Sequence, residues 1–267
     1  MIELKDDQRF ENDRRSSKGN QYKFYTDNKW YKADYLGYEG LAEYVVSKLL
    51  RFSTLTEDEY TNYECESIKY KNTILTGCVS RDFSEGWSLI TLERLFKDSY
   101  GHGLNNIIYS VNDHQDRLKI LTDQVVRTTG LENFGVYMNK LLTIDALFLN
   151  EDRHTHNIAV LTKNDKFKLA PIFDNGACLL SDTSLEYPLN NDPLDYISSV
   201  KPKTFSESFE EQLEISERLY GQNIKFNFTY NDVHNILEKA DIYSPEIRQR
   251  AEDIIMEMRR KYKYLFE

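Results

Sequence analysis

One stretch of the sequence gathers most of its reactive side chains: Asn150-Glu151-Asp152-Arg153-His154-Thr155-His156-Asn157. It follows an apolar run that predicts a helix from Phe134 to Leu149, and it precedes two short β-like runs joined by a turn at residues 163–165. After this predicted hairpin comes Phe173-Asp174-Asn175-Gly176. Asp and Asn are common in turns, so a structural role for Asp152 and Asn157 is one alternative.

The order of these polar residues favours a second alternative. Phosphoryl transfer uses a carboxylate that orients the acceptor hydroxyl, an Asn five residues later and a further Asp, the last two holding magnesium. Asp152, Asn157 and Asp174 have this order, and carboxylate and amide oxygens are ligands that Mg²⁺ accepts. His154 and His156 make a poor zinc set by themselves, so we expect His154 to orient the loop and assign no role to His156.

Upstream, the sequence offers a candidate for binding the phosphates. Residues 22–25 and 29–34 predict a β-hairpin around the turn 26–28, and Glu39 to Phe52 predicts an amphipathic helix. Lys32 on the strand and Glu43 on the helix match the lysine–glutamate ion pair of a kinase site, with Glu39 as the alternative partner. The other interpretation is that these are ordinary surface charges.

A polar loop precedes that hairpin. Residues 16–23 contain a single glycine, so the loop is a weak phosphate cradle by itself, and a disordered N-terminal arm is the alternative. The candidate phosphate-binding residues are Ser17, Lys18, Gly19, Asn20, Gln21 and Lys23.

The coarse pattern predicts an α+β chain with two lobes. We expect a polar arm at residues 1–15, a β-rich lobe with one main helix at 16–85, and a larger helical lobe at 86–267. Extended segments are predicted near 60–70 and 72–82, and residues 175–203 predict a long surface segment. The remaining helices are predicted at 89–96, 116–128, 206–219, 230–239 and 244–264.

Composition narrows the classes of function. A net charge of −10 argues against an extended nucleic-acid surface, because binding a long polyanion requires clustered Lys and Arg. The absence of a long apolar run and of a leader pattern predicts a cytoplasmic protein with no membrane contact. Three widely spaced cysteines suggest neither a disulfide framework nor a zinc site.

The motifs resemble those of the HipA family of serine/threonine kinases. The stretch 150–157 looks like the catalytic loop of that family, residues 169–174 resemble its second metal-binding segment, and residues 18–23 look like its phosphate loop. Residues 78–83 resemble its strand and hinge. The resemblance implies a two-lobed protein-kinase-like fold and phosphorylation of a protein hydroxyl with ATP and Mg²⁺. It also places the adenine at the backbone of Val79 and Ser80, and His154 among the nucleotide-binding residues.

The chain departs from the longer toxin members of the family, because the phosphate loop begins near residue 16 and leaves no room for their additional N-terminal subdomain. The resemblance therefore favours the compact form, with an antitoxin-type partner as an open alternative. It also makes Ser16 or Ser17 a candidate for autophosphorylation. Two rival functions are a non-catalytic ATP-binding or partner-binding module, and a kinase acting on a lipid or small molecule.

Overall fold

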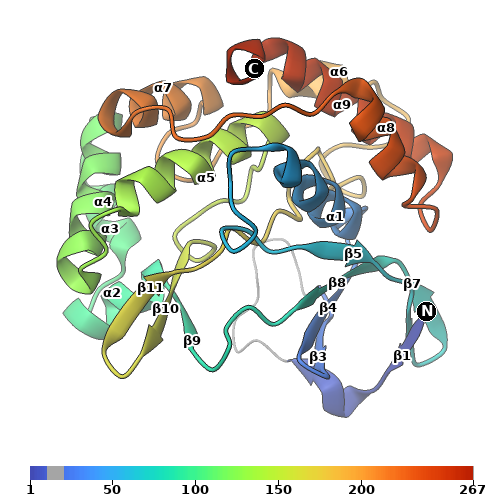
Figure 1. The fold of residues 1–267 in the computed structure, drawn as a ribbon, viewed down its shortest axis with the longest axis horizontal. Helices are drawn as coiled ribbons and strands as arrows, with labels where there is room; N and C mark the ends of the chain where they lie inside the picture. The colour runs from blue at the N-terminus through green and yellow to red at the C-terminus, as the bar shows by residue number, and fades with distance from the viewer. Residues whose placement is uncertain (11–20, 267) are drawn as a thin grey trace. The chain divides into compact units, whose positions relative to one another are not determined.

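The computed structural model describes residues 1–10 and 21–266, and it divides into two compact units. Unit 1 contains Met1–Phe83, Phe173–Ser199 and Lys225–Glu267, and unit 2 contains Ser84–Ile172 and Val200–Ile224. The fold is α+β, with a β-rich N-terminal region and a helical C-terminal part (Figure 1), as the sequence predicts.

The main sheet of unit 1 has the strand order β2-β3-β4-β8-β5. Its strands are Arg9–Phe10 (β2), Lys23–Thr26 (β3), Lys29–Ala33 (β4), Tyr63–Cys65 (β5) and Gly77–Arg81 (β8). The predicted β3–β4 hairpin is present, and Asp27 and Asn28 take positive φ at its turn, where their short polar side chains tolerate the left-handed region. Lys32 lies in register with Lys23 on one side and with Cys78 on the other.

A second sheet in unit 1 has the order β1-β6-β7, with bounds Ile2–Leu4, Ile68–Tyr70 and Thr73–Leu75. Strand β1 pairs in parallel with β6, and Leu4 joins a buried cluster that contains Phe24, Tyr31 and Tyr70. The expectation of a structureless arm over residues 1–15 is therefore wrong for its first ten residues. The cause is tertiary pairing, since β1 finds its partner more than sixty residues along the chain.

Helix α1 (Glu39–Leu49), followed by the short helix Leu50–Phe52, contacts β5 and β8 (Figure 1). The sequence predicts an amphipathic helix, but residues 40–49 are buried all round, because α8 (Tyr230–Glu238) also contacts α1. Gly40 allows a close approach to β8: a Cβ atom there would lie 2.6 Å from the carbonyl carbon of Gly77.

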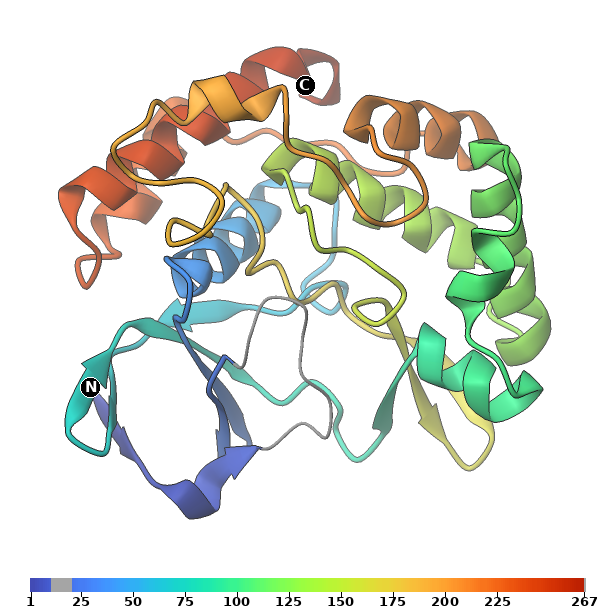
Figure 2. The same cartoon turned by 180° about the vertical axis from the view of Figure 1, so that it is seen from behind.

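Unit 2 combines one sheet with several helices (Figure 2). The sheet has the order β11-β10-β9, with bounds Lys166–Leu169, Ala159–Lys163 and Ser88–Thr91. The helices are α2 (Leu92–Tyr100), α3 (Leu104–Ile108), α4 (His114–Thr129), α5 (Phe134–Phe148) and α7 (Phe209–Tyr220). The predicted helix 89–96 is thus wrong at its start, since residues 88–91 pair with β10 and the Thr91 hydroxyl caps the helix by accepting from the Arg94 N–H.

The unit boundaries differ from the predicted lobes, because α8 and α9 (Pro245–Lys261) group with the β-rich unit and contact α1 and α6 (Leu194–Ile197) respectively. The segment 175–203 is also more than a surface segment. Cys178, Leu179 and Leu180 are fully buried in it, and the buried Arg250 of α9 donates hydrogen bonds to the carbonyls of Tyr187 and Asn191. Within the described residues, no helix is both long and apolar enough to span a membrane.

Candidate functional site

Lys32 is held between two carboxylates of unit 1. Its Nζ lies 2.5 Å from Oε1 of Glu43 on α1 and 2.8 Å from Oδ1 of Asp174, which follows β11 in sequence. Burial alone would lower the pKa of Lys32, but the carboxylates of Asp174 and Glu43 outweigh it and raise the pKa well above its usual range. Lys32 therefore carries a full positive charge at neutral pH.

The structure distinguishes the two possible partners of this lysine. Glu43 contacts Lys32 with Oε1 and accepts the Asn175 N–H with Oε2 at 2.8 Å, so it joins β4 to the backbone after Asp174. Glu39 instead accepts the backbone N–H groups of Leu36 and Gly37, at 2.8 and 3.1 Å. Asp174 has a φ of 62°, a conformation that is uncommon outside glycine and that often occurs at functional sites.

Other predicted nucleotide-binding residues fall in three groups. Lys23 lies directly opposite Lys32 across the β3–β4 ladder, so both side chains are on one face of the sheet. Ser17, Lys18, Gly19 and Asn20 lie outside the described residues, and so does Ser16; Gln21 lies just before β3.

Val79 and Ser80 do not fit the role expected of them. Both are inside β8, and Ser80 is in register with Trp30 of β4 and Tyr63 of β5. Since the backbone of a strand with neighbours on both sides is taken up by its ladders, these two residues cannot hold an adenine by their backbone. The predicted hinge residues therefore lie inside strand β8.

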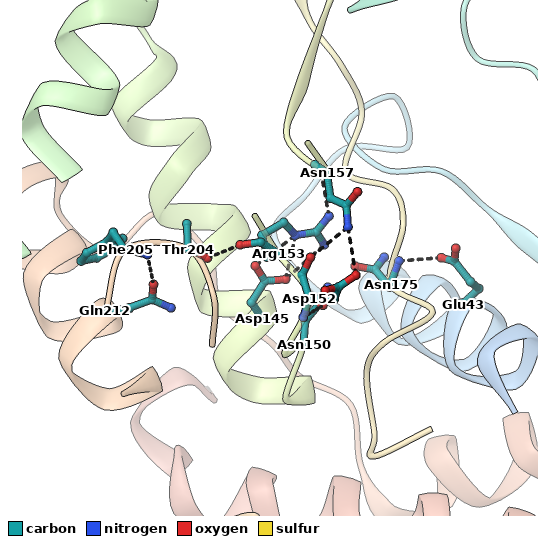
Figure 3. A network of polar contacts seen from close by, with 10 residues as sticks. All are labelled: Glu43, Asp145, Asn150, Asp152, Arg153, Asn157, Asn175, Thr204, Phe205 and Gln212. Carbon is teal, nitrogen blue, oxygen red and sulfur yellow. Dashed lines mark hydrogen bonds and ion pairs between the residues drawn. The ribbon is translucent and has the colours of Figure 1, made fainter. Parts of the chain in front are cut away.

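In unit 2, the loop 150–157 is anchored by a buried ion pair. Arg153 donates to both carboxylate oxygens of Asp145 on α5 at 3.1–3.2 Å, and each side chain is only 1% exposed (Figure 3). Burial raises the pKa of Asp145, and the Arg153 guanidinium opposes that rise. Arg153 also donates to the Asn157 carbonyl at 3.3 Å, which ties the end of the loop to its middle.

Asp152 and Asn157 are brought together by this loop. The Nδ2 of Asn157 donates to the Asp152 carbonyl at 2.9 Å and lies 3.4 Å from Asp152 Oδ2, while the Asn157 N–H donates to the His154 carbonyl at 2.7 Å (Figure 3). Because Nδ2 is used in this way, the amide oxygen is the atom of Asn157 that is suited to a metal ion. The three residues of the predicted magnesium and catalytic set belong to different units. Asp152 and Asn157 are in unit 2, and Asp174 is in unit 1.

Two positively charged or chargeable groups approach the other oxygen of Asp152. Lys203 Nζ lies 3.5 Å and His154 Nε2 lies 3.8 Å from Oδ1. The sequence analysis missed Lys203 and the anchor Asp145. Asp145 had a usable signal, since it is the one acidic residue of α5 and its neighbours in sequence are apolar, but Lys203 had none, because it lies far from the loop in sequence.

Comparison with known proteins identifies a solved structure with a similar fold. No protein-family model and no curated protein matches the chain. Among solved structures, its fold is similar to that of a kinase. The crystal structure of the Helicobacter pylori proinflammatory kinase CtkA matches with a TM-score of 0.61 and 17% sequence identity, over 97% of this chain and 95% of the other. At this identity the similarity concerns the fold.

Proposed function

We propose that this protein is an ATP- and magnesium-dependent serine/threonine protein kinase of the HipA-like type. The observation that carries the proposal is the buried Lys32 between Glu43 and Asp174. A strand lysine paired with a helix glutamate is the arrangement that positions the α- and β-phosphates in kinases, and the Asp beside it is the type of residue that binds the metal. The kinase fold of the CtkA structure supports the same class.

The charge of this set also supports a cation-dependent phosphate site. Lys32 is shared by two carboxylates, and the Asp174 side chain is 26% exposed, so a cation can reach it. Lys23 lies opposite Lys32 across the strand ladder and adds a second ammonium on that face of the sheet, which favours anionic groups there. A magnesium-bound polyphosphate brings both the metal for Asp174 and the anion for the lysines.

Asn157 and Asp174 would hold Mg²⁺, since oxygen donors of this kind suit that ion. When bound, magnesium would supply positive charge that offsets the negative charge of the phosphates. In this proposal Lys32 positions the phosphates, Glu43 orients Lys32, and Asp152 orients the acceptor hydroxyl and takes its proton. His154 and Gln21 would contact the nucleotide, together with the loop residues Ser17 to Asn20 and with Lys23.

The finer expectations from the sequence also belong to the proposal. Ser16 or Ser17 would be the site of autophosphorylation, the acceptor would be a serine or threonine of a protein, and an antitoxin-type protein would be a partner. The proposed location is cytoplasmic.

The test is phosphate transfer by purified protein from labelled ATP with Mg²⁺, to itself or to lysate proteins. We expect Asp152→Asn and Asp174→Asn each to lower transfer by at least about 100-fold. A matched control is Asp165→Asn, at the exposed turn between β10 and β11, which should retain activity.

Other outcomes would favour the rival functions. ATP binding by calorimetry without turnover would support a non-catalytic module. A labelled lipid or small molecule in place of a labelled protein would support a kinase that acts on a lipid or small molecule. A wild-type protein that neither binds ATP nor transfers phosphate would contradict the kinase assignment.

A further inference from the structure

Asp152 has two oxygens in different surroundings. Oδ2 lies 3.4 Å from the Asn157 amide, whereas Oδ1 is buried and receives no hydrogen bond from any residue in 1–10 or 21–266. A buried carboxylate oxygen without a donor is costly, so its surroundings need an explanation. Among the residues that the structure describes, the nearest charged group is the ammonium of Lys203, at 3.5 Å.

The segment that carries Lys203 is fixed in place. The Tyr109 hydroxyl donates to the carbonyls of Lys203 and Thr204, at 3.1 and 3.2 Å. The hydroxyl of the buried Thr204 donates to the Arg153 carbonyl at 2.6 Å (Figure 3). Because Lys203 lies near Asp152, consecutive residues of this segment contact consecutive residues of the loop. Pro202, directly before Lys203, is buried and restricts the backbone further.

The side chain of Lys203 is partly open to solvent. It is 47% exposed, in contrast to the fixed backbone beneath it, and its ammonium has three donors. At 3.5 Å the ammonium is slightly beyond an ordinary N–H···O distance. It therefore attracts the Asp152 carboxylate electrostatically without a hydrogen bond that would fix its position. A lysine so placed can move between Asp152 and an anionic group that arrives beside it.

We propose that Lys203 is a catalytic residue of the phosphoryl transfer, supplying positive charge to the phosphoryl group at the acceptor side; this rests on the proposed kinase function. In the step, the acceptor oxygen forms a bond to the γ-phosphorus and the bond from that phosphorus to the bridging oxygen of ATP breaks, with its electron pair leaving on ADP. The acceptor proton passes to Asp152. Lys203 pairs with Asp152 before the step and with the transferred phosphoryl oxygens during it.

The experiment compares three variants by the maximal rate of phosphate transfer and the half-saturating ATP concentration, on whichever phosphorylated protein the wild type yields. Lys203→Met should lower the maximal rate by about 100-fold and change half-saturation by less than about twofold, since the lost interaction acts in the transition state. Lys203→Arg keeps the charge and should recover at least about a tenth of the rate. Lys201→Met is the matched control on the other side of Pro202, where the lysine pairs with Glu207, and it should match wild type.

Several results would overturn the assignment. Equal rates for Lys203→Met and Lys201→Met would do so, and so would a faster Lys203→Met, since that would show that the lysine blocks Asp152. An equal loss in Lys203→Arg would remove the role of charge. A rate loss accompanied by a lower urea midpoint than that of Lys201→Met would indicate a structural role. Wild-type protein that transfers no phosphate would contradict the kinase function, and this proposal with it.

Discussion

Two of the buried sets of charges in residues 1–10 and 21–266 differ in their composition and in their contact with solvent. In unit 2, Asp145 and Arg153 form a one-to-one pair, and both side chains are 1% exposed. In unit 1, Lys32 serves two carboxylates, of which Glu43 is 2% exposed and Asp174 is 26% exposed. The first set joins one cation to one anion away from solvent, whereas the second joins one cation to two carboxylates, one of which is in contact with solvent.

This difference separates a scaffold from a reactive site. A balanced pair without solvent contact has no reason to exchange partners, and here it fixes the backbone of the loop that carries Asp152. In the second set, Asp174 is partly exposed and has a carboxylate oxygen of the kind that binds a metal cation. Variants in the first set should therefore act mainly on stability, and variants in the second mainly on activity.

The largest expected effect is on the closed pair. Asp145→Ala leaves the Arg153 guanidinium buried without its counter-charge, and we expect a loss of about 3–5 kcal/mol in the free energy of unfolding, measured in urea. The double variant Asp145→Leu with Arg153→Met should recover most of this loss, because it removes both charges.

An exposed ion pair provides the control. Glu207→Ala breaks the exposed pair with Lys201 and should leave the unfolding midpoint unchanged. If Asp145→Ala unfolds at the same urea concentration as Glu207→Ala, the closed pair is not a scaffold and the comparison fails.

The second effect concerns Glu43. Glu43→Gln keeps an oxygen for the Asn175 N–H but loses the charge beside Lys32, so phosphate transfer should fall by about 100-fold while stability changes little. The same isosteric change at Glu39, one turn earlier on α1, keeps one of the two oxygens that accept from Leu36 and Gly37, and it should leave transfer intact because Glu39 does not contact Lys32. Equal activity losses in the two variants would show that the α1 position matters and the ion pair does not.

The contrast between the two sets also explains what the sequence could predict. The pairing of Lys32 with a carboxylate of the following helix was predictable, because strand β4 and helix α1 are neighbours in sequence and their element types are clear from residue patterns. The choice between Glu43 and Glu39 was not, since both lie near one face of α1 and only the tertiary contact with Asn175 separates them.

Contacts between segments that are distant in sequence were the part of the fold that the sequence predicted least well. Strand β1 has an alternation too short to recognise among charged residues, and its partner β6 is remote in sequence. Residues 178–180 lie in a stretch without periodicity, where Leu179 and Leu180 take positive φ and are nevertheless buried. Lys203 reaches Asp152 across fifty-one positions, and no local pattern encodes such a contact.

The smallest of these effects concerns Asp34, a residue of unit 1 that directly follows strand β4, which carries Lys32. It accepts the Gly40 N–H at 2.5 Å and the Tyr243 hydroxyl at 2.8 Å, which are neutral donors. Burial raises the pKa of Asp34 to about 6; the nearby Glu39 carboxylate adds to the rise, while hydrogen bonds from Thr76, Gly40 and Tyr243 oppose it. Asp34 thus differs from Glu43 and Asp145, because its hydrogen-bond donors are neutral whereas theirs include a cation.

The sign of the pH effect follows from this rise. Between the ordinary pKa of 3.8 and about 6, the folded protein holds the Asp34 proton more tightly than the unfolded chain, so protonation stabilises the fold. That contribution is complete below about pH 4 and is lost as the pH rises through 6. The shift corresponds to at most about 3 kcal/mol, and solvent contact of the side chain reduces this to about 2 kcal/mol.

Asp34→Asn keeps an acceptor for the Gly40 N–H but cannot ionise, so it isolates this contribution. The free energy of unfolding of the wild type minus that of Asp34→Asn, from urea titrations at pH 4, 5, 6 and 7, should fall by about 2 kcal/mol across the series. All other acids titrate in both proteins and cancel in the difference. A difference that rises with pH would mean that the fold favours the charged form of Asp34. The distinction between Asp34 and the cation-paired acids Glu43 and Asp145 would then be wrong.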